Sequence, residues 1–239
     1  MKKYTTFILK RLHTDVYFAG GRLLGIVFTG GECPPPQIIT RLIEKDAKGA
    51  LLVAADSGLM AAARAGLRPD WITGDMDSID DISRLAAWPP ERVIRHQRDK
   101  DYTDTELALL LAAEKGCDEV WIIGGGGGRI DHLFGIRSLF EREAFPRRWI
   151  TEAADIRCID ANAAQRGLST SLEKGASVSV FPLGAGPWEA GSRGLKWPLE
   201  GLPWNRGFFG LSNAAPQGDF IIKAEKGRFM VILPLPVIL

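Results

Sequence analysis

Aspartate residues follow several short apolar runs in the first part of this chain. Asp56 follows one run, and Asp75 and Asp77 follow the next one along the sequence. Further aspartates follow two later runs, namely Asp99, Asp101, Asp104 and Asp131. If these runs are parallel strands, their carboxyl ends share one edge of a sheet, where ligands bind in such folds. The spacing therefore predicts a group of carboxylates at a ligand-binding edge.

Carboxylates gathered in this way repel one another, because like charges raise each other's pKa and cost stability unless a cation is present. Mg²⁺ typically binds one or two carboxylates together with phosphate oxygens. Aspartate is also a common cap and turn residue, and that use would explain a single Asp-x-Asp pair. It does not explain acids after four separate runs, so the pattern indicates a magnesium-dependent enzyme that transfers a phosphate-containing group.

A glycine run, Gly124–Gly128, leads into Arg129, Asp131 and His132. Glycines let the backbone approach a polyanion, and a helix that starts after them offers N–H donors. Arg129 could bind a phosphate and stabilise the charge that develops during transfer. A flexible connector explains the run equally well, and a lone histidine is more often structural than catalytic. The run matches neither the dinucleotide-binding GxGxxG context nor the P-loop.

An alternation of short strands and helices must position these residues. We expect strands over 24–28, 50–55, 71–73, 92–94 and 119–123, and helices over 37–47, 59–65 and 105–115. Asp56 and Ser57 stand where the cap of the second helix belongs. This order is typical of a Rossmann-like α/β domain, with a parallel sheet covered by helices on both faces.

The pattern changes after about residue 150. Short apolar runs over 177–181, 220–223 and 229–233 are separated by segments rich in glycine and proline, which is typical of a small antiparallel sandwich or barrel. Lys196 and Trp197 lie in one such segment and could form a stacking wall for an aromatic cation, although Trp197 as an ordinary core residue is the default. We expect an α/β nucleotide- and metal-binding catalytic domain over 1–150 and a β-sandwich domain over 151–239.

The composition limits the possible functions. The 30 Lys and Arg balance 29 Asp and Glu, for a net charge of +1, so nothing suggests a nucleic-acid partner. The three cysteines, Cys33, Cys117 and Cys158, are widely spaced and are expected to be free thiols in a reducing cytoplasm. No apolar stretch approaches the roughly 20 residues that span a bilayer. We expect a cytoplasmic protein without a membrane partner, and we assign no role to the first 22 residues.

Together, and in this order, the motifs resemble the thiamine pyrophosphokinase family. The segments that carry the resemblance are Ala55–Gly58, Gly74–Ser78, Asp99–Asp104, Gly127–His132, Gly194–Leu199 and Leu211–Asn213. The resemblance implies an N-terminal α/β domain, a C-terminal β-sandwich that binds thiamine, and a homodimer with active sites at the subunit interface. It also implies that ATP and thiamine give thiamine diphosphate and AMP, with Mg²⁺ required. Ser57, Met76 and Ala214 depart from the residues common in the family.

The resemblance also implies roles for the matching residues. Asp75, Asp77 and Asp104 would hold Mg²⁺. Asp101, Arg129 and Asp131 would complete the catalytic set, with one of the two aspartates orienting the thiamine hydroxyl or taking its proton. The substrate-binding residues would be Asp56, Ser57, Lys100, Thr103, Gly128, His132, Lys196, Trp197, Ser212 and Asn213. Among these, Trp197, Ser212 and Asn213 would contact thiamine from the partner subunit.

Two other functions remain open. A related diphosphokinase that acts on a pterin or another hydroxymethyl heterocycle would keep the aspartates and change only the acceptor pocket. A nucleotide- or thiamine-binding sensor would need no turnover, and the intact set of Asp75, Asp77 and Asp104 argues against it. AMP release separates the enzymes from the sensor, and the choice of acceptor separates the two enzymes.

Overall fold

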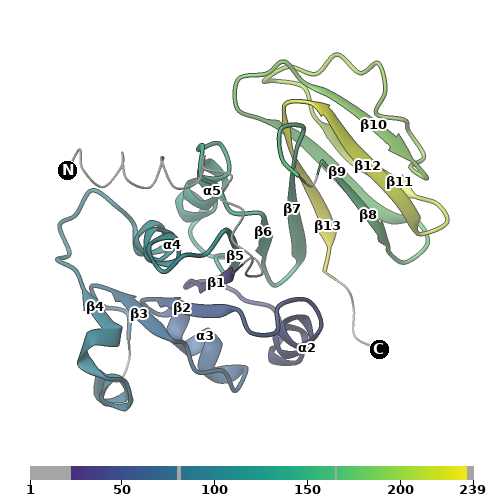
Figure 1. The fold of residues 1–239 in the computed structure, drawn as a ribbon. Helices are drawn as coiled ribbons and strands as arrows, with labels where there is room; N and C mark the ends of the chain where they lie inside the picture. The colour runs from purple at the N-terminus through teal and green to yellow at the C-terminus, as the bar shows by residue number, and fades with distance from the viewer. Residues whose placement is uncertain (1–22, 80–81, 165, 236–239) are drawn as a thin grey trace. The chain divides into compact units, whose positions relative to one another are not determined.

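The computed structural model describes residues 23–79, 82–164 and 166–235. The chain divides into two compact units. The first contains the described residues up to Leu139 together with 143–146 and 150–152, and the second contains 140–142, 147–149 and the residues from 153 onward. The first 22 residues, to which the sequence assigns no role, lie outside the described part. Elements carry the labels of Figure 1.

Parallel strands in the order β5-β1-β2-β3-β4 form the sheet of the first unit. Their bounds are Leu24–Phe28 for β1, Leu51–Ala55 for β2, Trp71–Gly74 for β3, Val93–Arg95 for β4 and Glu119–Ile123 for β5. The last three residues of β1 are completely buried, as expected for a strand covered on both faces. The predicted strands are confirmed, with ends that differ by at most one residue.

Helices cover both faces of this sheet (Figure 1). Neighbouring side chains of a strand point to opposite faces, and β2 shows the result. Val53 packs in one cluster with Leu111 of α4, whereas Ala54 packs in another with Leu59 of α3. The helices are α2 (Pro36–Asp46), α3 (Gly58–Arg64), α4 (Asp104–Glu114) and α5 (Ile130–Leu139), with short 3₁₀ helices η1 (Ile82–Ala87) and η2 (Pro90–Arg92). The predicted two-faced α/β layer is confirmed.

Antiparallel strands build the second unit. One group has the order β11-β9-β13-β7, and a separate three-stranded sheet has the order β10-β12-β8. The bounds are Ala154–Asp160 for β7, Gly167–Ser171 for β8, Ala176–Leu183 for β9, Glu189–Arg193 for β10, Gly210–Ala215 for β11, Asp219–Lys226 for β12 and Arg228–Pro234 for β13. The short strand β6 (Arg148–Ile150) lies where the chain passes from one unit to the other.

A common core joins the two sheets of the second unit. Phe220 and Ile222 of β12 pack in the same cluster as Val180 of β9 and Phe229 of β13. Burial alternates along β12, as expected when one face of a strand meets the core and the other meets solvent. The predicted β-sandwich is confirmed.

A buried ion cluster lies in the second unit. The carboxylate of Asp155 accepts two hydrogen bonds from Arg148, at 2.8 and 2.7 Å, and two from Arg157, both at 2.9 Å. Asp155 is only 5% exposed. Burial opposes the ionised form, but the hydrogen bonds and charges of the two arginines outweigh it and lower the pKa of Asp155. The cluster therefore contributes stability only while this carboxylate is charged.

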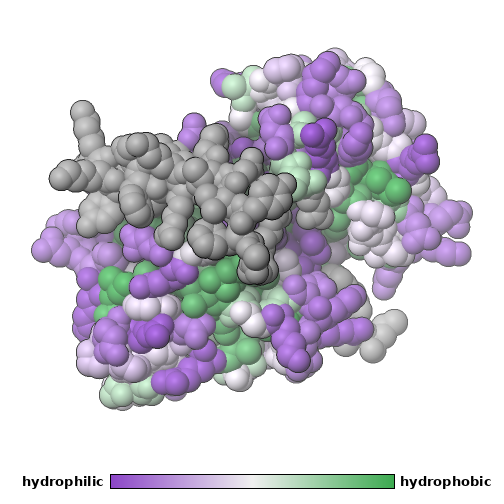
Figure 2. Space-filling view, viewed as in Figure 1, coloured by the Kyte–Doolittle hydropathy of each residue, from purple (hydrophilic) through white to green (hydrophobic). Residues whose placement is uncertain are grey.

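Polar and charged side chains dominate the described surface that Figure 2 shows, with smaller apolar areas between them. Within the described ranges, no helix is both long and apolar enough to cross a membrane.

Candidate active site

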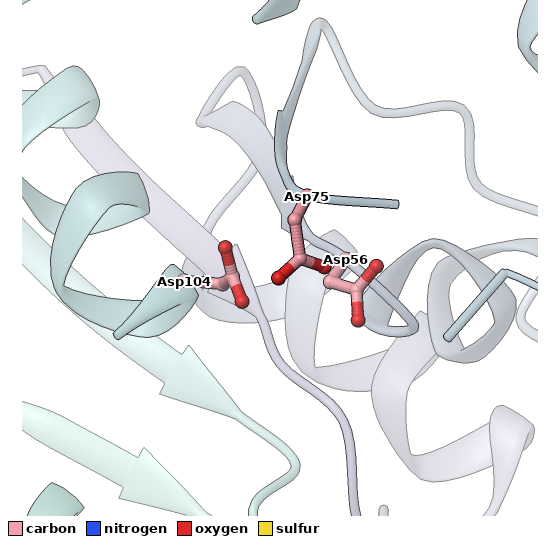
Figure 3. Close-up of side chains that lie close together, drawn as sticks. All are labelled: Asp56, Asp75 and Asp104. Carbon is pink, nitrogen blue, oxygen red and sulfur yellow. The ribbon is translucent and has the colours of Figure 1, made fainter. Parts of the chain in front are cut away.

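Three aspartates from three elements converge at the carboxyl edge of the parallel sheet (Figure 3). Asp56 follows β2, Asp75 follows β3 and Asp104 begins α4. One carboxylate oxygen from each lies within 4.8 Å of the others. Asp56 is 8% exposed, and its buried Oδ1 atom has no hydrogen-bond donor among the residues that the structure describes. A buried acceptor left unpaired costs free energy. This all-oxygen donor set therefore fits a hard divalent cation such as Mg²⁺.

The backbone is shaped to bring these carboxylates together. Asp56 has a φ of 47°, and its N–H donates to the Thr73 carbonyl at 2.9 Å. Gly74 has a φ of 148°, and a Cβ there would lie 3.1 Å from the Asp56 Cβ and 3.2 Å from Asp104 Oδ1. Glycine is thus required at position 74, because a side chain would occupy the space between the acids. Strained backbone of this kind is characteristic of functional sites.

Lys100 lies among the carboxylates. Its Nζ atom is 2.9 Å from Asp104 Oδ1 and 3.2 Å from Asp75 Oδ2. Burial acts against the charged form of Asp75, but the Asp77 N–H and the Lys100 ammonium outweigh it and lower the pKa of Asp75. Burial likewise opposes the charge on Lys100, and its bonds to the two carboxylates outweigh it and raise the pKa of Lys100.

Asp56 is in a different electrostatic state. Burial raises its pKa above the usual range, and the nearby charges of Asp104 and Asp75 add to the rise. The Ser78 side chain, whose hydroxyl donates to Asp77, and the N–H of Ser57 oppose this rise in the pKa of Asp56. Lys100 therefore stabilises two members of the group, while no cationic side chain in the described ranges pairs with Asp56.

A capping box fixes Asp104 at the first position of α4. The Glu106 N–H donates to Thr103 Oγ1 at 3.2 Å, and the Thr103 N–H donates to Glu106 Oε2 at 2.8 Å. Two free N–H groups of the helix end are thereby satisfied. Thr103, predicted to bind substrate, thus has a structural role in this arrangement. The signal was present in the sequence as Thr-x-x-Glu before an apolar run.

The metal set expected from the sequence named Asp77, whereas the group in the structure contains Asp56. The Asp77 carboxylate lies 3.5 Å from Arg98 Nε and accepts a bond from the Ser78 hydroxyl at 3.0 Å. Met76 has a φ of 66° and is 4% exposed. The turn buries the Met76 side chain and leaves Asp77 at the surface. A metal-binding role of Asp77 stays a prediction, and Asp101 is likewise exposed and outside the group.

The glycine run is held by backbone hydrogen bonds. The Gly124 N–H donates to Ile150, the Gly125 N–H donates to Gly30 at 2.7 Å, and Gly126 exchanges two bonds with Glu32. The interpretation of this run as a flexible connector is therefore wrong for its first three residues. Their N–H groups are used within the protein, so backbone contacts to a phosphate would come from Gly127, Gly128 or the start of α5.

The charged residues after the run are exposed. Arg129 Nε donates to Asp131 Oδ1 at 3.1 Å, and a second bond joins the same two side chains. These bonds lower the pKa of Asp131. Asp131 and the exposed His132 lie on the first turn of α5 and are not members of the Asp56, Asp75 and Asp104 group. Their predicted roles would require a ligand that reaches from the Asp56, Asp75 and Asp104 group to the first turn of α5.

The residues expected to bind thiamine lie in the second unit. Trp197 is 53% exposed, which contradicts its interpretation as a core residue, and Lys196 Nζ lies 4.4 Å from the centre of its ring. Asn213 is buried and clamps the Trp197 backbone, accepting from its N–H at 3.1 Å and donating to its carbonyl at 2.6 Å. Asn213 therefore positions Trp197, a role that the sequence did not reveal. Ser212 is exposed, with a φ of 57°.

A parallel sheet with carboxylates gathered at its carboxyl edge defines an α/β protein with a candidate metal–phosphate site. Residues 44–148, which include all three aspartates and Lys100, match the family model "Thiamin pyrophosphokinase, catalytic domain". In sequence and in fold, the chain is similar to thiamine pyrophosphokinases.

Individual thiamine pyrophosphokinases are similar to this chain in sequence and in fold. A thiamine pyrophosphokinase of Bacillus subtilis is 36% identical over 104 residues, which are 42% of this chain and 48% of that protein, so the match spans about half of the relative. Thiamine pyrophosphokinase 1 of Arabidopsis thaliana is 26% identical over 72% of this chain and 67% of its own length. A crystal structure of the Bacillus subtilis thiamine pyrophosphokinase is 26% identical, with a TM-score of 0.71, and the match covers 90% of this chain and 100% of that one.

Proposed function

We propose that this chain is a thiamine pyrophosphokinase, which transfers the diphosphate of ATP to the hydroxyl of thiamine and releases AMP. The observation that carries the proposal is the convergence of Asp56, Asp75 and Asp104 inside the segment that matches the family's catalytic domain. Support for the acceptor comes from the names of the relatives, and the exposed Trp197 offers a surface on which an aromatic cation can stack.

The chain's residues would act mainly by positioning and by neutralising charge, since phosphoryl transfer requires little covalent chemistry from the protein. Asp56, Asp75 and Asp104 would hold Mg²⁺, with Asp77 next to them. The bound ion would supply charge neutralisation at the phosphate oxygens. Arg129 would bind the transferring group, and Asp101 or Asp131 would orient the thiamine hydroxyl or accept its proton.

The second unit would supply the acceptor pocket. Trp197 would stack on thiamine, held in place by Asn213, and Lys196 and Ser212 would line the same surface. We assign residues 1–150 to nucleotide and metal binding and 151–239 to thiamine binding. The proposed assembly is a cytoplasmic homodimer. In it, Trp197 of one copy would bind the thiamine that reacts at the Asp56, Asp75 and Asp104 group of the other copy.

The test measures AMP formation by the purified chain with ATP and Mg²⁺, with and without thiamine. We expect thiamine-dependent AMP that a chelator abolishes. Asp104→Asn should lower turnover by about 10²-fold or more, since it removes a ligand of the metal ion that would neutralise charge on the transferring phosphate. Glu114→Gln is the matched control, because Glu114 is an exposed residue at the other end of α4, and it should keep wild-type activity.

Three results would contradict the proposal. AMP formation with a hydroxymethyl pterin but not with thiamine would assign the chain to the related diphosphokinase. Binding of ATP and Mg²⁺ without any AMP would indicate a sensor. Near-normal turnover of a folded Asp104→Asn variant would refute the assignment of the metal site.

A further inference from the structure

We propose that the Lys100 ammonium acts as an internal cation. It pairs with the carboxylates of Asp75 and Asp104 when no divalent ion is bound, and it moves to the phosphates of ATP when the ion binds. This inference rests on the proposed function only for its second half. The first half concerns the protein and a metal ion alone.

The first argument is the placement of the ammonium. Lys100 Nζ lies between Asp104 and Asp75, at 2.9 and 3.2 Å, and the three side chains are between 13% and 25% exposed. Asp104 and Asp75 are two of the three members of the candidate metal group. A divalent ion bound to these oxygens would lie at about 2.0–2.1 Å from them. An ammonium group at its present distance would then lie within a few ångströms of a doubly charged ion, and the repulsion between the two favours displacement of the ammonium.

The second argument is the charge balance. Among the described residues, the Lys100 ammonium is paired with two of the three carboxylates, and the buried Oδ1 of Asp56 has no hydrogen-bond donor. Lys100 therefore offsets part of the repulsion among the three carboxylates when no metal is bound, but it does not neutralise their charge. A divalent ion would replace the ammonium with twice the charge and would also reach Asp56. The group is thus arranged for exchange of one cation for another.

The third argument concerns the destination of the displaced side chain. Lys100 lies in the segment between β4 and α4, and a lysine side chain is a point charge on a flexible four-carbon stem. Movement of a few ångströms would leave the ammonium beside any phosphate that the metal binds. Lysine is a common phosphate ligand of this kind. Lys100 would then contribute to binding ATP only after it has left the carboxylates.

The two halves predict opposite effects of one substitution. Lys100→Met keeps the length and the apolar stem of the side chain and removes its charge. Without the competing ammonium, binding of Mn²⁺ to the nucleotide-free protein should become about tenfold tighter. Binding of ATP at saturating Mn²⁺ should become about tenfold weaker. If Lys100 merely stabilised the fold, Lys100→Met would weaken the binding of both Mn²⁺ and ATP, since the acids would be less well ordered.

The experiment measures Mn²⁺ binding to the full chain by electron paramagnetic resonance and ATP binding by calorimetry. Thiamine is left out of both measurements. Lys48→Met is the control, because Lys48 is an exposed lysine just after α2, and it should change neither affinity. Thermal unfolding of each variant confirms that the fold is retained.

Unchanged or weaker Mn²⁺ binding by a folded Lys100→Met variant would overturn the internal-cation role. Tighter Mn²⁺ binding with unchanged ATP binding would overturn the phosphate role. Neither measurement depends on turnover, so a failure of thiamine-dependent AMP formation would be seen separately and would refute only the proposed function.

Discussion

Gly58→Ala should disturb both the stability of the first unit and its carboxylate group. Gly58 begins α3, two residues after Asp56. A Cβ at this position would lie 2.1 Å from the Phe28 carbonyl oxygen, 2.4 Å from the Phe28 carbonyl carbon and 2.8 Å from the Thr29 nitrogen. All three are backbone atoms, so no side-chain rotation relieves the overlap.

The magnitude follows from this geometry. Contacts of a Cβ below 3.0 Å essentially do not occur, so helix and strand must separate by about 1 Å. Phe28 is completely buried in a central strand, which leaves α3 as the part that moves. Overpacking of a core costs about 1–3 kcal/mol, and a clash with backbone belongs at the upper end. In a chain of this size, about 3 kcal/mol lowers Tm by roughly 6–12 °C. Displacement of Asp56 should also weaken Mn²⁺ binding.

The assay is thermal unfolding followed by circular dichroism, together with Mn²⁺ titration. Gly135→Ala is the control, because Gly135 lies in α5 of the same unit and a Cβ there meets no atom within 4 Å. Alanine is favoured over glycine inside a helix by about 0.5–1 kcal/mol, so this variant should unfold at the wild-type temperature or slightly above it. A Gly58→Ala protein with wild-type Tm and Mn²⁺ affinity would refute the reasoning.

Two further predictions concern the second unit. Asp155→Asn removes the buried carboxylate that accepts hydrogen bonds from Arg148 and Arg157, which should cost about 3–5 kcal/mol in urea unfolding. Because the pKa of Asp155 is lowered in the folded state, its contribution to stability is present above the ordinary pKa of about 4 and is lost as the pH falls below that value. The wild type should therefore lose stability on acidification more steeply than the variant. Equal slopes of stability against pH for the two proteins would contradict this. Asn213→Ala removes both hydrogen bonds to the Trp197 backbone, so we expect a loss of about 1–3 kcal/mol and a higher KM for thiamine, and an unchanged KM would argue against a positioning role.

The inner part of the parallel sheet could be predicted because strands buried on both faces stand out as continuous apolar runs. β1 and β5 are examples, and each begins and ends where the sequence predicts. The meeting of Asp56, Asp75 and Asp104 followed from the same pattern, since parallel strands end at one edge. The choice between Asp56 and Asp77 could not be predicted, because it depends on the backbone turn at Met76.

The second unit was predicted less completely, for a physical reason. The runs that became β9, β12 and β13 contain core residues of the sandwich. β8, β10 and β11 are strands at the edges of their sheets and show few consecutive apolar residues. Their sequences carry little periodicity, because an edge strand is held by its backbone pairing as much as by its side chains.

The central position of β1 has a consequence for synthesis of the chain. One edge of β1 pairs with β2, but the other pairs with β5, and Leu24 meets Glu119, 95 residues further along. At about 5–20 residues per second, β5 is completed roughly 3–14 s after β2. During that interval the nascent sheet presents a buried-type apolar strand with an unpaired edge, which is a template for pairing with other chains. Chains that end before residue 119 should accordingly aggregate, and a chaperone that covers the open edge of β1 would protect the chain during its synthesis.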